Sequence, residues 1–341
     1  MKTIGDKIKK LRIEKGMSQT DLANKLNLSN QAISKWENNF SLPDINLLPE
    51  IASIFGINID DLFEYTKEKQ YEKISNTIGY GYKLNNNEFN NFEEFLMDEI
   101  KKDSLNHKAI SLLGELYIYQ ASCLNDKAIE YGKKALELKP NTKYNINIIN
   151  SGYNGALFDW NVRNHHELIE YYIKTLKLNP ENKRLYFYLL DNLIEDGRYN
   201  DATYYLQESF KNNPDNLNEY YEILIDEKKF GFNNVKDRYY ELVTKYQDWR
   251  TLFSVADTFA QNECYTEAID LWYKAFEVQE KPRYTDYFES ISQAYIMLND
   301  YNGAIEALKN KIKLLKEEWG IKFGKEVNKL NERIKKLEEK S

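Results

Sequence analysis

A repeat with a period near 34 residues is the feature that most limits how this chain can fold. Two equivalent prolines, Pro180 and Pro214, lie 34 residues apart, and two equivalent alanines, Ala268 and Ala304, lie 36 apart. Small residues at this spacing let paired helices cross closely, and one such pair cannot bury its apolar face alone. The period therefore predicts an all-α fold in which helix pairs stack into an α-solenoid.

These repeats resemble the tetratricopeptide repeat over residues 105–316, in about six units. The resemblance is strongest in the first, third, fifth and sixth units. The final segment, residues 319–340, is charged and amphipathic, as expected of a helix that covers the last apolar face of a solenoid. We therefore expect a repeat domain with a C-terminal capping helix over residues 105–341.

In a tetratricopeptide array the first helix of each pair lines a concave groove, as the resemblance implies. The repeat phase makes seven polar residues candidates for peptide binding there: Asn147, Asn154, Arg184, Asp191, Asn218, Arg250 and Asp257. The third and fifth units each place an Arg and an Asp seven residues apart, with a Phe between them. Such a surface suits an extended peptide, because amides can bind its backbone and arginines its carboxylates. The alternative is that these charges are solvated and pair along their own helix.

The first 38 residues carry the signals of three short helices. Gly16 ends a first amphipathic segment. Ser18, with Asp21 three residues later, has the spacing of a capping box that starts a second helix. Ser29 is placed to cap a third helix over residues 30–38. Two short helices joined by a tight turn predict a helix-turn-helix.

The third of these helices has one apolar face and one polar face. At about 3.6 residues per turn, Ile33 and Trp36 point inward. The opposite face then holds Asn30, Gln31, Ser34, Lys35 and Asn38. An Asn or Gln amide can bond the N6 and N7 atoms of adenine together, and a Lys suits guanine or a phosphate. We therefore expect this helix to read DNA; the alternative is an ordinary solvated face.

Residues 4–63 resemble the Cro/C1-type (XRE family) DNA-binding domain over its whole length. The resemblance implies a five-helix domain over residues 1–65. It also implies DNA contacts from Gln19, Asn30, Gln31, Ser34 and Lys35, to which the outward face of the third helix adds Asn38.

Two other features follow from that resemblance. Arg12 and Glu37 match a structural ion pair between the first and third helices. Glycines are common where this chain has Asn27 and Asn39, and Asn tolerates the left-handed backbone better than other non-glycine residues. Beyond the domain, residues 66–104 are expected to form linker helices.

Charge is distributed unevenly along the chain. The whole chain carries a net charge of -7 and has a pI near 5.4, which excludes a globally basic nucleic-acid-binding protein. Residues 1–38, however, hold eight basic and four acidic side chains, a net charge of +4. Residues 39–66 hold five acidic and no basic side chains. Any affinity for DNA must therefore come from the first helices.

Other classes of function find little support in the sequence. No run approaches the roughly 18 apolar residues of a membrane span, and the N-terminus lacks the apolar region of a signal peptide, so we expect a cytoplasmic protein without membrane contact. His165, His166 and Glu167 lack the spacing of a zinc-protease helix. Without a phosphate-binding loop or a nucleophile elbow, we expect no enzyme activity, no metal and no cofactor.

An XRE-type domain followed by tetratricopeptide repeats resembles the peptide-pheromone-sensing regulators of Gram-positive bacteria, often grouped as RRNPP. That resemblance implies a homodimeric transcription factor that binds double-stranded DNA and a short peptide. The peptide would shift the population of dimer geometries, and so the spacing of the two DNA-binding heads. Two alternatives stay open: repeats that bind a partner protein instead of a peptide, and an adaptor whose head no longer binds DNA.

Overall fold

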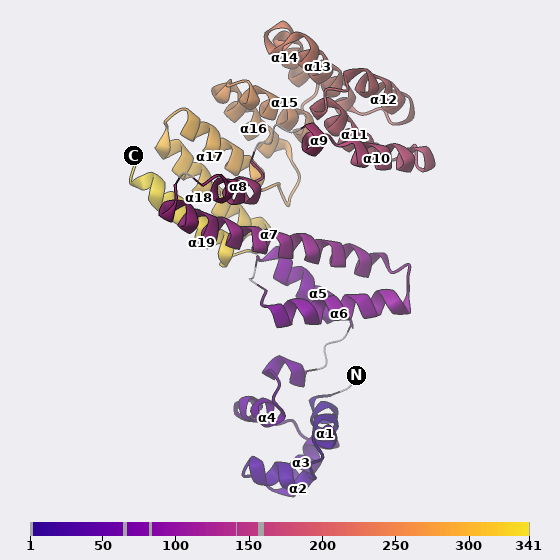
Figure 1. Cartoon of the computed structure of the whole chain (residues 1–341), viewed down its shortest axis with the longest axis vertical. Helices are drawn as coiled ribbons and strands as arrows, with labels where there is room; N and C mark the ends of the chain where they lie inside the picture. The colour runs from indigo at the N-terminus through magenta and orange to yellow at the C-terminus, as the bar shows by residue number, and fades with distance from the viewer. Residues whose placement is uncertain (1–2, 64–66, 82–83, 141, 156–159, 341) are drawn as a thin grey trace. The chain divides into compact units, whose positions relative to one another are not determined.

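The computed structural model of the chain describes residues 3–63, 67–81, 84–140, 142–155 and 160–340 (Figure 1). All regular secondary structure in these ranges is helical, which confirms the all-α fold class. The chain divides into two compact units, Met1–Gly79 with Lys83–Ser122, and Tyr80–Tyr82 with Cys123–Ser341. None of the helices in the described ranges combines the length and the apolar character needed to span a membrane.

The first unit begins with the expected helix-turn-helix. Its elements are α1 (Ile4–Glu14), α2 (Gln19–Lys25), α3 (Asn30–Glu37), η1 (Ile45–Leu47), α4 (Leu48–Phe55) and η2 (Ile59–Leu62). In place of the expected fifth helix, the domain has the 3₁₀ helix η2. The side chains of Ser18 and Asp21 form the predicted capping box at the start of α2, and Ser29 accepts a hydrogen bond from the backbone N–H of Ala32.

Two asparagines end helices of this domain in the left-handed conformation that the sequence predicts. Asn27 follows α2 with φ of 52°, and Asn39 follows α3 with φ of 61°. The side-chain amide of Asn39 also donates to Asp6 over 3.4 Å. Asn therefore serves at both turns where related domains commonly have glycine.

Gly5 lets α1 cross closely over the C-terminal end of α3. A Cβ atom at this position would lie 1.9 Å from the backbone carbonyl oxygen of Trp36. Below the crossing lies a core that includes Ile8, Leu22 and Ile33, all fully buried. Helix α3, the recognition helix, is thus held against the rest of the domain by the close backbone contact with α1 as well as by its own apolar side chains.

The rest of the first unit contains α5 (Lys67–Gly79) and α6 (Asn86–Lys102), which lie in the stretch 66–104 where linker helices were expected. Their apolar stripes form a separate core with the start of α7 (His107–Leu138). Ile74, Leu96 and Leu116 are its fully buried members.

Helix α7 corrects one prediction. The first repeat was expected to be a helix pair, but α7 is one continuous helix of 32 residues. The segment that should have formed the turn, residues 119–127, contains neither Gly nor Pro, so nothing in it interrupts the helix. Two later glycines instead bring α7 against α8 (Lys143–Gly152): a Cβ on Gly132 would lie 2.9 Å from Ile148, and one on Gly152 would lie 2.5 Å from Ile129.

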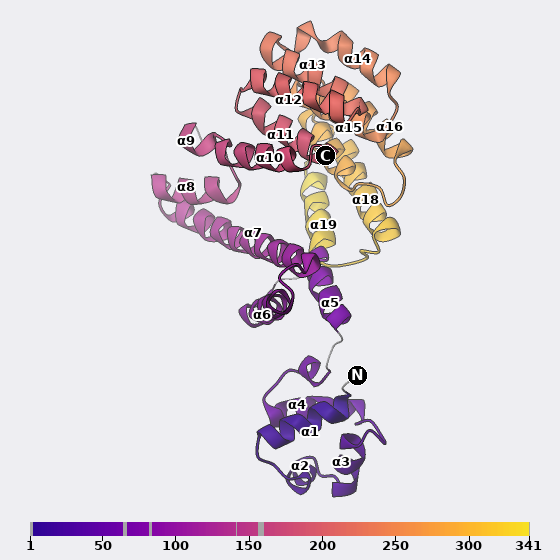
Figure 2. The same ribbon diagram turned by 90° about the vertical axis from the view of Figure 1, so that its right-hand side faces the viewer.

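The remainder of the second unit is a stack of helix pairs (Figures 1 and 2). After the short α9 (Trp160–Arg163) come α10 (His166–Leu178), α11 (Lys183–Glu195), α12 (Tyr199–Asn212), α13 (Asn216–Phe230), η3 (Phe232–Asn234), α14 (Lys236–Lys245), α15 (Trp249–Gln261), α16 (Tyr265–Val278), α17 (Asp286–Met297), α18 (Tyr301–Glu318) and α19 (Lys325–Glu338). Neighbours in this order pack on one another, and α13 also contacts α11 and α15.

The landmarks of the sequence repeat lie where these helices cross. Ala202, Ala268 and Ala304 begin the second helices of three pairs, and all three are fully buried. Leu330 and Ile334 of α19 pack in a core with Leu308 of α18. Helix α19 therefore covers apolar side chains of α18, and its role as a capping helix stays a prediction.

Candidate nucleic-acid interface and repeat groove

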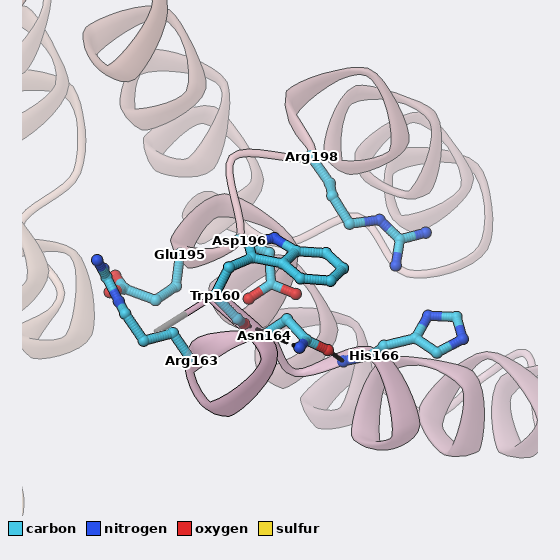
Figure 3. A pocket seen from close by; sticks show the side chains of 7 residues that line it. All are labelled: Trp160, Arg163, Asn164, His166, Glu195, Asp196 and Arg198. Atoms are coloured by element: carbon cyan, nitrogen blue, oxygen red, sulfur yellow. Dashed lines mark hydrogen bonds between the residues drawn. The ribbon is translucent and has the colours of Figure 1, made fainter. Parts of the chain in front are cut away.

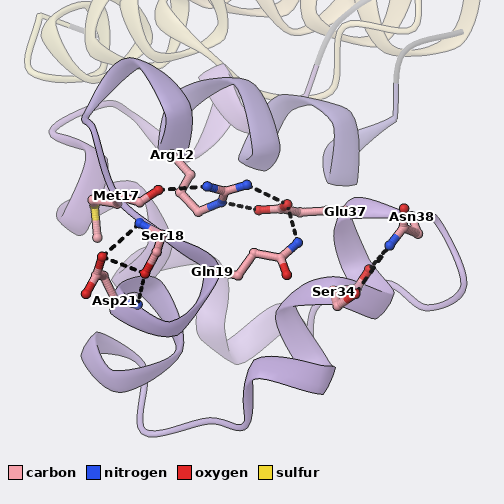
Figure 4. Close-up of polar contacts among 8 residues, drawn as sticks. All are labelled: Arg12, Met17, Ser18, Gln19, Asp21, Ser34, Glu37 and Asn38. Atoms are coloured by element: carbon pink, nitrogen blue, oxygen red, sulfur yellow. Dashed lines mark hydrogen bonds and ion pairs between the residues drawn. The ribbon is translucent and has the colours of Figure 1, made fainter.

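An ion pair inside the helix-turn-helix joins α1 to α3 (Figure 4). Arg12 donates to both carboxylate oxygens of Glu37, with Nε to Oε1 at 2.6 Å and Nη2 to Oε2 at 2.9 Å. Its remaining Nη1 donates to the backbone carbonyl oxygen of Met17 at 2.7 Å. Glu37 is only 3% exposed. The resemblance-based prediction of a structural ion pair is therefore confirmed, and these two residues are part of the scaffold.

The charge of Glu37 is stabilised by this geometry. Burial raises its pKa, but the hydrogen bonds from Arg12 and Gln19 outweigh burial and leave the pKa below the ordinary value. The hydrogen bonds to Glu37 and the charge of that residue raise the pKa of Arg12, against the effect of burial. Both groups are consequently charged at neutral pH.

The outer face of α3 presents two side chains that are free to bind a ligand. Gln31 and Lys35 are exposed, and neither has a hydrogen bond or an ion pair within the described part of the chain. Ile33 and Trp36, on the opposite face, are buried. Of the predicted DNA-binding residues, Gln31 and Lys35 are thus the ones ready to contact bases or phosphates without rearrangement.

Three other candidates on this surface, Asn30, Ser34 and Asn38, already have intramolecular partners; the Ser34 hydroxyl accepts from Asn38 Nδ2 at 3.3 Å. The amide of Asn30 donates to the hydroxyl of Thr20 at 3.0 Å. Asn38, the C-cap of α3, donates to the backbone carbonyl oxygen of Ser34 at 2.8 Å (Figure 4). These bonds orient the side chains, and each amide still has a free oxygen. Their roles in DNA binding stay predictions.

Gln19 is a less simple case. Its Nε2 donates to Glu37 Oε2 at 2.8 Å, which uses one of the two N–H groups of the amide. The second N–H and the carbonyl oxygen can still bond a ligand, but the bond to Glu37 fixes the direction in which they point. The DNA contact by Gln19 stays a prediction.

In the second unit, α11 and α15 bear the repeated Arg–Phe–Asp pattern. On α11, Arg184 is exposed, and Asp191 accepts a hydrogen bond from the Tyr221 hydroxyl at 2.7 Å. The ring of Phe187 stacks on that of Tyr221 at 5.3 Å. Desolvation raises the pKa of Asp191, and the Tyr221 hydrogen bond opposes this shift. Tyr221, which is not one of the seven peptide-binding candidates, thus orients the carboxylate.

The structure contradicts the prediction for Asn218. This residue is fully buried between α12 and α13. Its Oδ1 accepts from the Ser209 hydroxyl at 3.0 Å, and its Nδ2 donates to the backbone carbonyl oxygen of Asn213 at 3.3 Å. Its amide therefore stabilises the connection between two helices and cannot reach a ligand in the groove. The repeat phase predicted that Asn218 lines the groove. That prediction is wrong because the fourth repeat matches the tetratricopeptide pattern only weakly.

Arg250 is also engaged within the chain. Its Nη2 lies 3.1 and 3.0 Å from the two carboxylate oxygens of Asp215, the N-cap residue of α13. This ion pair joins two adjacent repeats. The alternative interpretation, in which the charged residues pair along their own helix, does not describe it. Because Asp215 already neutralises it, Arg250 is a weaker candidate than Arg184 for binding a carboxylate.

The last two amide candidates lie outside the regular array. Asn147 is exposed on α8, and Asn154 is exposed in the turn after α8 with φ of 52°. The left-handed backbone gives Asn154 a clear structural role. Peptide binding by either residue remains a prediction.

A cleft of about 560 Å³ lies between α15 and α17, and Asp257 is in its wall. The carboxylate accepts a hydrogen bond from the indole Nε1 of Trp272 at 2.9 Å. Burial raises the pKa of Asp257 to about 6; the Trp272 hydrogen bond opposes the shift and the charge of Asp286 adds to it. Asp257 therefore lies in the wall of a cleft, and its role in peptide binding stays a prediction.

A second cleft, of about 550 Å³, lies near α9 and the ends of α10 and α11. Figure 3 shows Trp160, which is 79% exposed, among the charged side chains of this cleft. Asp196, in its wall, accepts from the backbone N–H of His165 and lies 2.6 Å from His165 Nδ1. The described residues contain no group of three or more His, Cys, Asp or Glu placed to hold a metal.

Comparisons with known proteins concern mainly the first unit. A helix-turn-helix family model matches residues 8–62. An uncharacterized HTH-type transcriptional regulator of Methanocaldococcus jannaschii is 36% identical over 64 residues, which cover 19% of this chain and 97% of that protein. The HTH-type transcriptional activator BcrR of Enterococcus faecalis is 39% identical over 57 residues, or 17% of this chain, so the chain spans only 28% of that relative's length.

Several solved structures align over nearly the whole chain. One of them is PlcR of Bacillus thuringiensis, crystallised in complex with the peptide PapR7 and DNA. The two sequences are 12% identical, the alignment covers 99% of each chain, and the TM-score is 0.28.

Proposed function

Because the chain belongs to the Cro/C1-type (XRE) helix-turn-helix family of transcriptional regulators, we propose that α3 reads double-stranded DNA and that the protein regulates transcription. The observation that carries this proposal is the free outer face of α3. Gln31 and Lys35 are exposed and have no partner among the residues that the structure describes, while the Arg12–Glu37 pair fixes the inner side of the same helix. In this proposal residues 1–65 form the DNA-binding head, 66–104 link it, and 105–341 form the repeat domain.

Substituting the two free residues should weaken DNA binding in different ways. Gln31→Ala is expected to cost about 1 to 3 kcal/mol and to relax the preference at one base pair, because it removes an amide that can bond two atoms of a base. If Lys35 contacts a phosphate, Lys35→Ala should weaken binding to all DNA sequences alike. It should also reduce the slope of log affinity against log salt concentration by about one. Selection from random DNA by the full chain measures both effects.

The matched control is Gln247→Ala, which truncates the same amide outside the head. We expect it to leave the selected DNA sequence unchanged. A base preference that survives Gln31→Ala would show that Gln31 does not read a base.

We also propose that the protein acts as a homodimer. A single small head buries only about 600 to 1,000 Å² on DNA, and two heads on a two-fold operator are the usual remedy. Light scattering by the full chain at micromolar concentration should give twice the chain mass of 40.5 kDa. A monomer that still binds its operator tightly would contradict this proposal.

For the second unit, we propose that the groove lined by α11, α13, α15 and α17 binds a short peptide that alters operator affinity. The support is chemical: Arg184 is exposed, and Asp191 and Asp257 are carboxylates oriented by neighbouring aromatic residues. A bound peptide can shift an equilibrium only if it binds one dimer geometry better than the other. Anisotropy of a labelled operator, with and without peptide, tests this. Unchanged affinity in the presence of a bound peptide would favour a protein partner instead.

A further inference from the structure

The cleft between α15 and α17 has a chemical character of its own. Its walls include Asp257 and Gln261 from α15, Trp272 from α16, and Ser290, Gln293 and Met297 from α17. We propose that this cleft binds a cationic group of a peptide, an ammonium or a guanidinium, with Asp257 as the counter-charge. This inference rests on the proposed peptide-binding function and names the ligand chemistry of its groove.

The first argument is charge balance. Several half-buried carboxylates elsewhere in the second unit lie against a cation: Asp215 against Arg250, Glu219 against Lys245, and Glu318 against Arg283. Asp257 has no ion pair within the described ranges, although it is half-buried. A partly desolvated carboxylate without a cation is costly, and a cation supplied by a ligand would offset that cost.

The second argument is that the other charged side chain in the wall of the cleft already has cationic partners within the chain. Glu289, on the opposite wall, pairs with Arg333 and with Lys311, whose Nζ lies 3.3 Å from Glu289 Oε2. The uncompensated charge of the cleft is thus that of Asp257. The described residues provide no group of three ligands for a metal ion, so an organic cation fits the cleft better than a metal does.

The third argument is preorganisation. The Trp272 indole N–H holds one carboxylate oxygen of Asp257 at 2.9 Å, so the other oxygen can bind a donor from the ligand. Gln261, Ser290 and Gln293 have no side-chain partner within the described ranges and can bond a peptide backbone. On α11, Asp191 repeats this arrangement with Tyr221 as the donor and likewise lacks an ion pair.

The test uses the full-length protein and a mixture of synthetic heptapeptides built from Ala, Gly, Leu, Phe and Ser. One set is N-acetylated and carries a single Lys, a second replaces that Lys by norleucine, and a third has a free N-terminus without Lys. Peptides retained by the protein are identified by mass spectrometry. We expect the Lys set, the free-amine set or both to be enriched about tenfold or more over the norleucine set, because a charge-assisted hydrogen bond forms only with the cation.

The variant Asp257→Asn separates the role of the charge from that of the fold. Its amide oxygen can still accept the Trp272 N–H, so the cleft should keep its shape. We expect it to lose the enrichment while still retaining neutral peptides. The control Asp270→Asn removes an equal charge from the exposed side of α16 and should keep the enrichment.

Each alternative outcome is distinguishable. Equal retention of the Lys and norleucine sets, or enrichment that survives Asp257→Asn, would overturn the inference but leave peptide binding intact. Retention of none of the peptides by the wild-type protein would overturn the peptide-binding function together with the inference. Comparing the retention of the first and third peptide sets shows whether the cleft binds a lysine side chain or an N-terminal ammonium group.

Discussion

Replacing Arg12 by alanine is expected to destabilise the DNA-binding head by about 3 to 5 kcal/mol. The reason is that Glu37 would remain buried without the guanidinium that neutralises it. The side chain of Glu37 is only 1% exposed and that of Arg12 is 12% exposed, so water cannot replace the lost partner. Hydrogen exchange of peptides from residues 1–40 measures this loss, because the full chain has several units that can open separately.

The exposed pair of Lys10 and Glu14 provides a control on the same helix. Their side chains are 58% and 55% exposed, and the charged atoms are 3.8 Å apart. Lys10→Ala should therefore cost no more than about 1 kcal/mol. If Arg12→Ala cost as little as Lys10→Ala, the ion pair would not be a structural element of the head.

The effect of Arg12→Ala should also depend on pH. The pKa of Glu37 in the folded head lies below its ordinary value of 4.5, so the ion pair contributes stability above that pH and loses it as the pH falls through the folded value. Without Arg12, the main hydrogen-bonding opposition to burial is gone and the pKa of Glu37 should rise. The stability difference between variant and wild type should consequently shrink between pH 7 and pH 4.

The same pair bears on DNA recognition through Gln19. Glu37 accepts hydrogen bonds from both Arg12 and Gln19, so the first residue of α2 is connected to the last residue of α3. A substitution at Glu37 would free the Gln19 amide for DNA while destabilising the helix that carries Gln31 and Lys35. Loss of operator binding by such a variant would not, by itself, identify a DNA contact.

Local signals in the sequence were sufficient to predict the helix-turn-helix. Capping boxes, an end glycine and two asparagines act within a few residues of one another, so their structural effect depends little on the rest of the chain. The structure confirms the capping box of Ser18 with Asp21 and the left-handed conformation of Asn27 and Asn39. What these signals could not show is the bond from Gln19 to Glu37, which joins residues 18 apart in the sequence.

The repeat domain shows where a periodic pattern stops being informative. Period and small residues correctly predicted the stacked pairs and the buried alanines Ala202, Ala268 and Ala304. The pattern could not tell a turn from continuous helix in α7, because that depends on residues between the landmarks. Nor could the pattern predict which side chains of the fourth repeat face the groove, because Asn218 lies in the interior.

Partners of charged residues were the least predictable feature of the groove. Arg250 and Asp215 are 35 residues apart and meet because adjacent repeats stack. Asp257 and Trp272 meet because the two helices of one pair cross. Neither contact has a signature within a single repeat, so Arg184 and Arg250 cannot be ranked from the sequence alone. Of these two arginines, Arg250 has an ion pair in the described part of the chain and Arg184 has none.

Gly5→Ala is expected to destabilise the head by about 1 to 3 kcal/mol, although alanine favours helix. The new Cβ would lie 1.9 Å from the carbonyl oxygen of Trp36 and 2.8 Å from the carbonyl carbon of that residue. Both are backbone atoms of α3, so the clash can be relieved only if α1 moves away from the recognition helix. Hydrogen exchange of α1 and α3 measures the loss, and operator affinity should fall with it because Trp36 belongs to the helix that carries Gln31 and Lys35.

Gly79→Ala, at the end of α5, is the matched control for this substitution. A Cβ there would meet no atom within 4 Å, so the change should be neutral or should stabilise the first unit by up to about 1 kcal/mol. Opposite signs for the same substitution at Gly5 and Gly79 would show that the close crossing of α1 over α3 determines the effect. A neutral Gly5→Ala would instead mean that α1 can shift without cost, and Gly5 would then not hold the recognition helix in place.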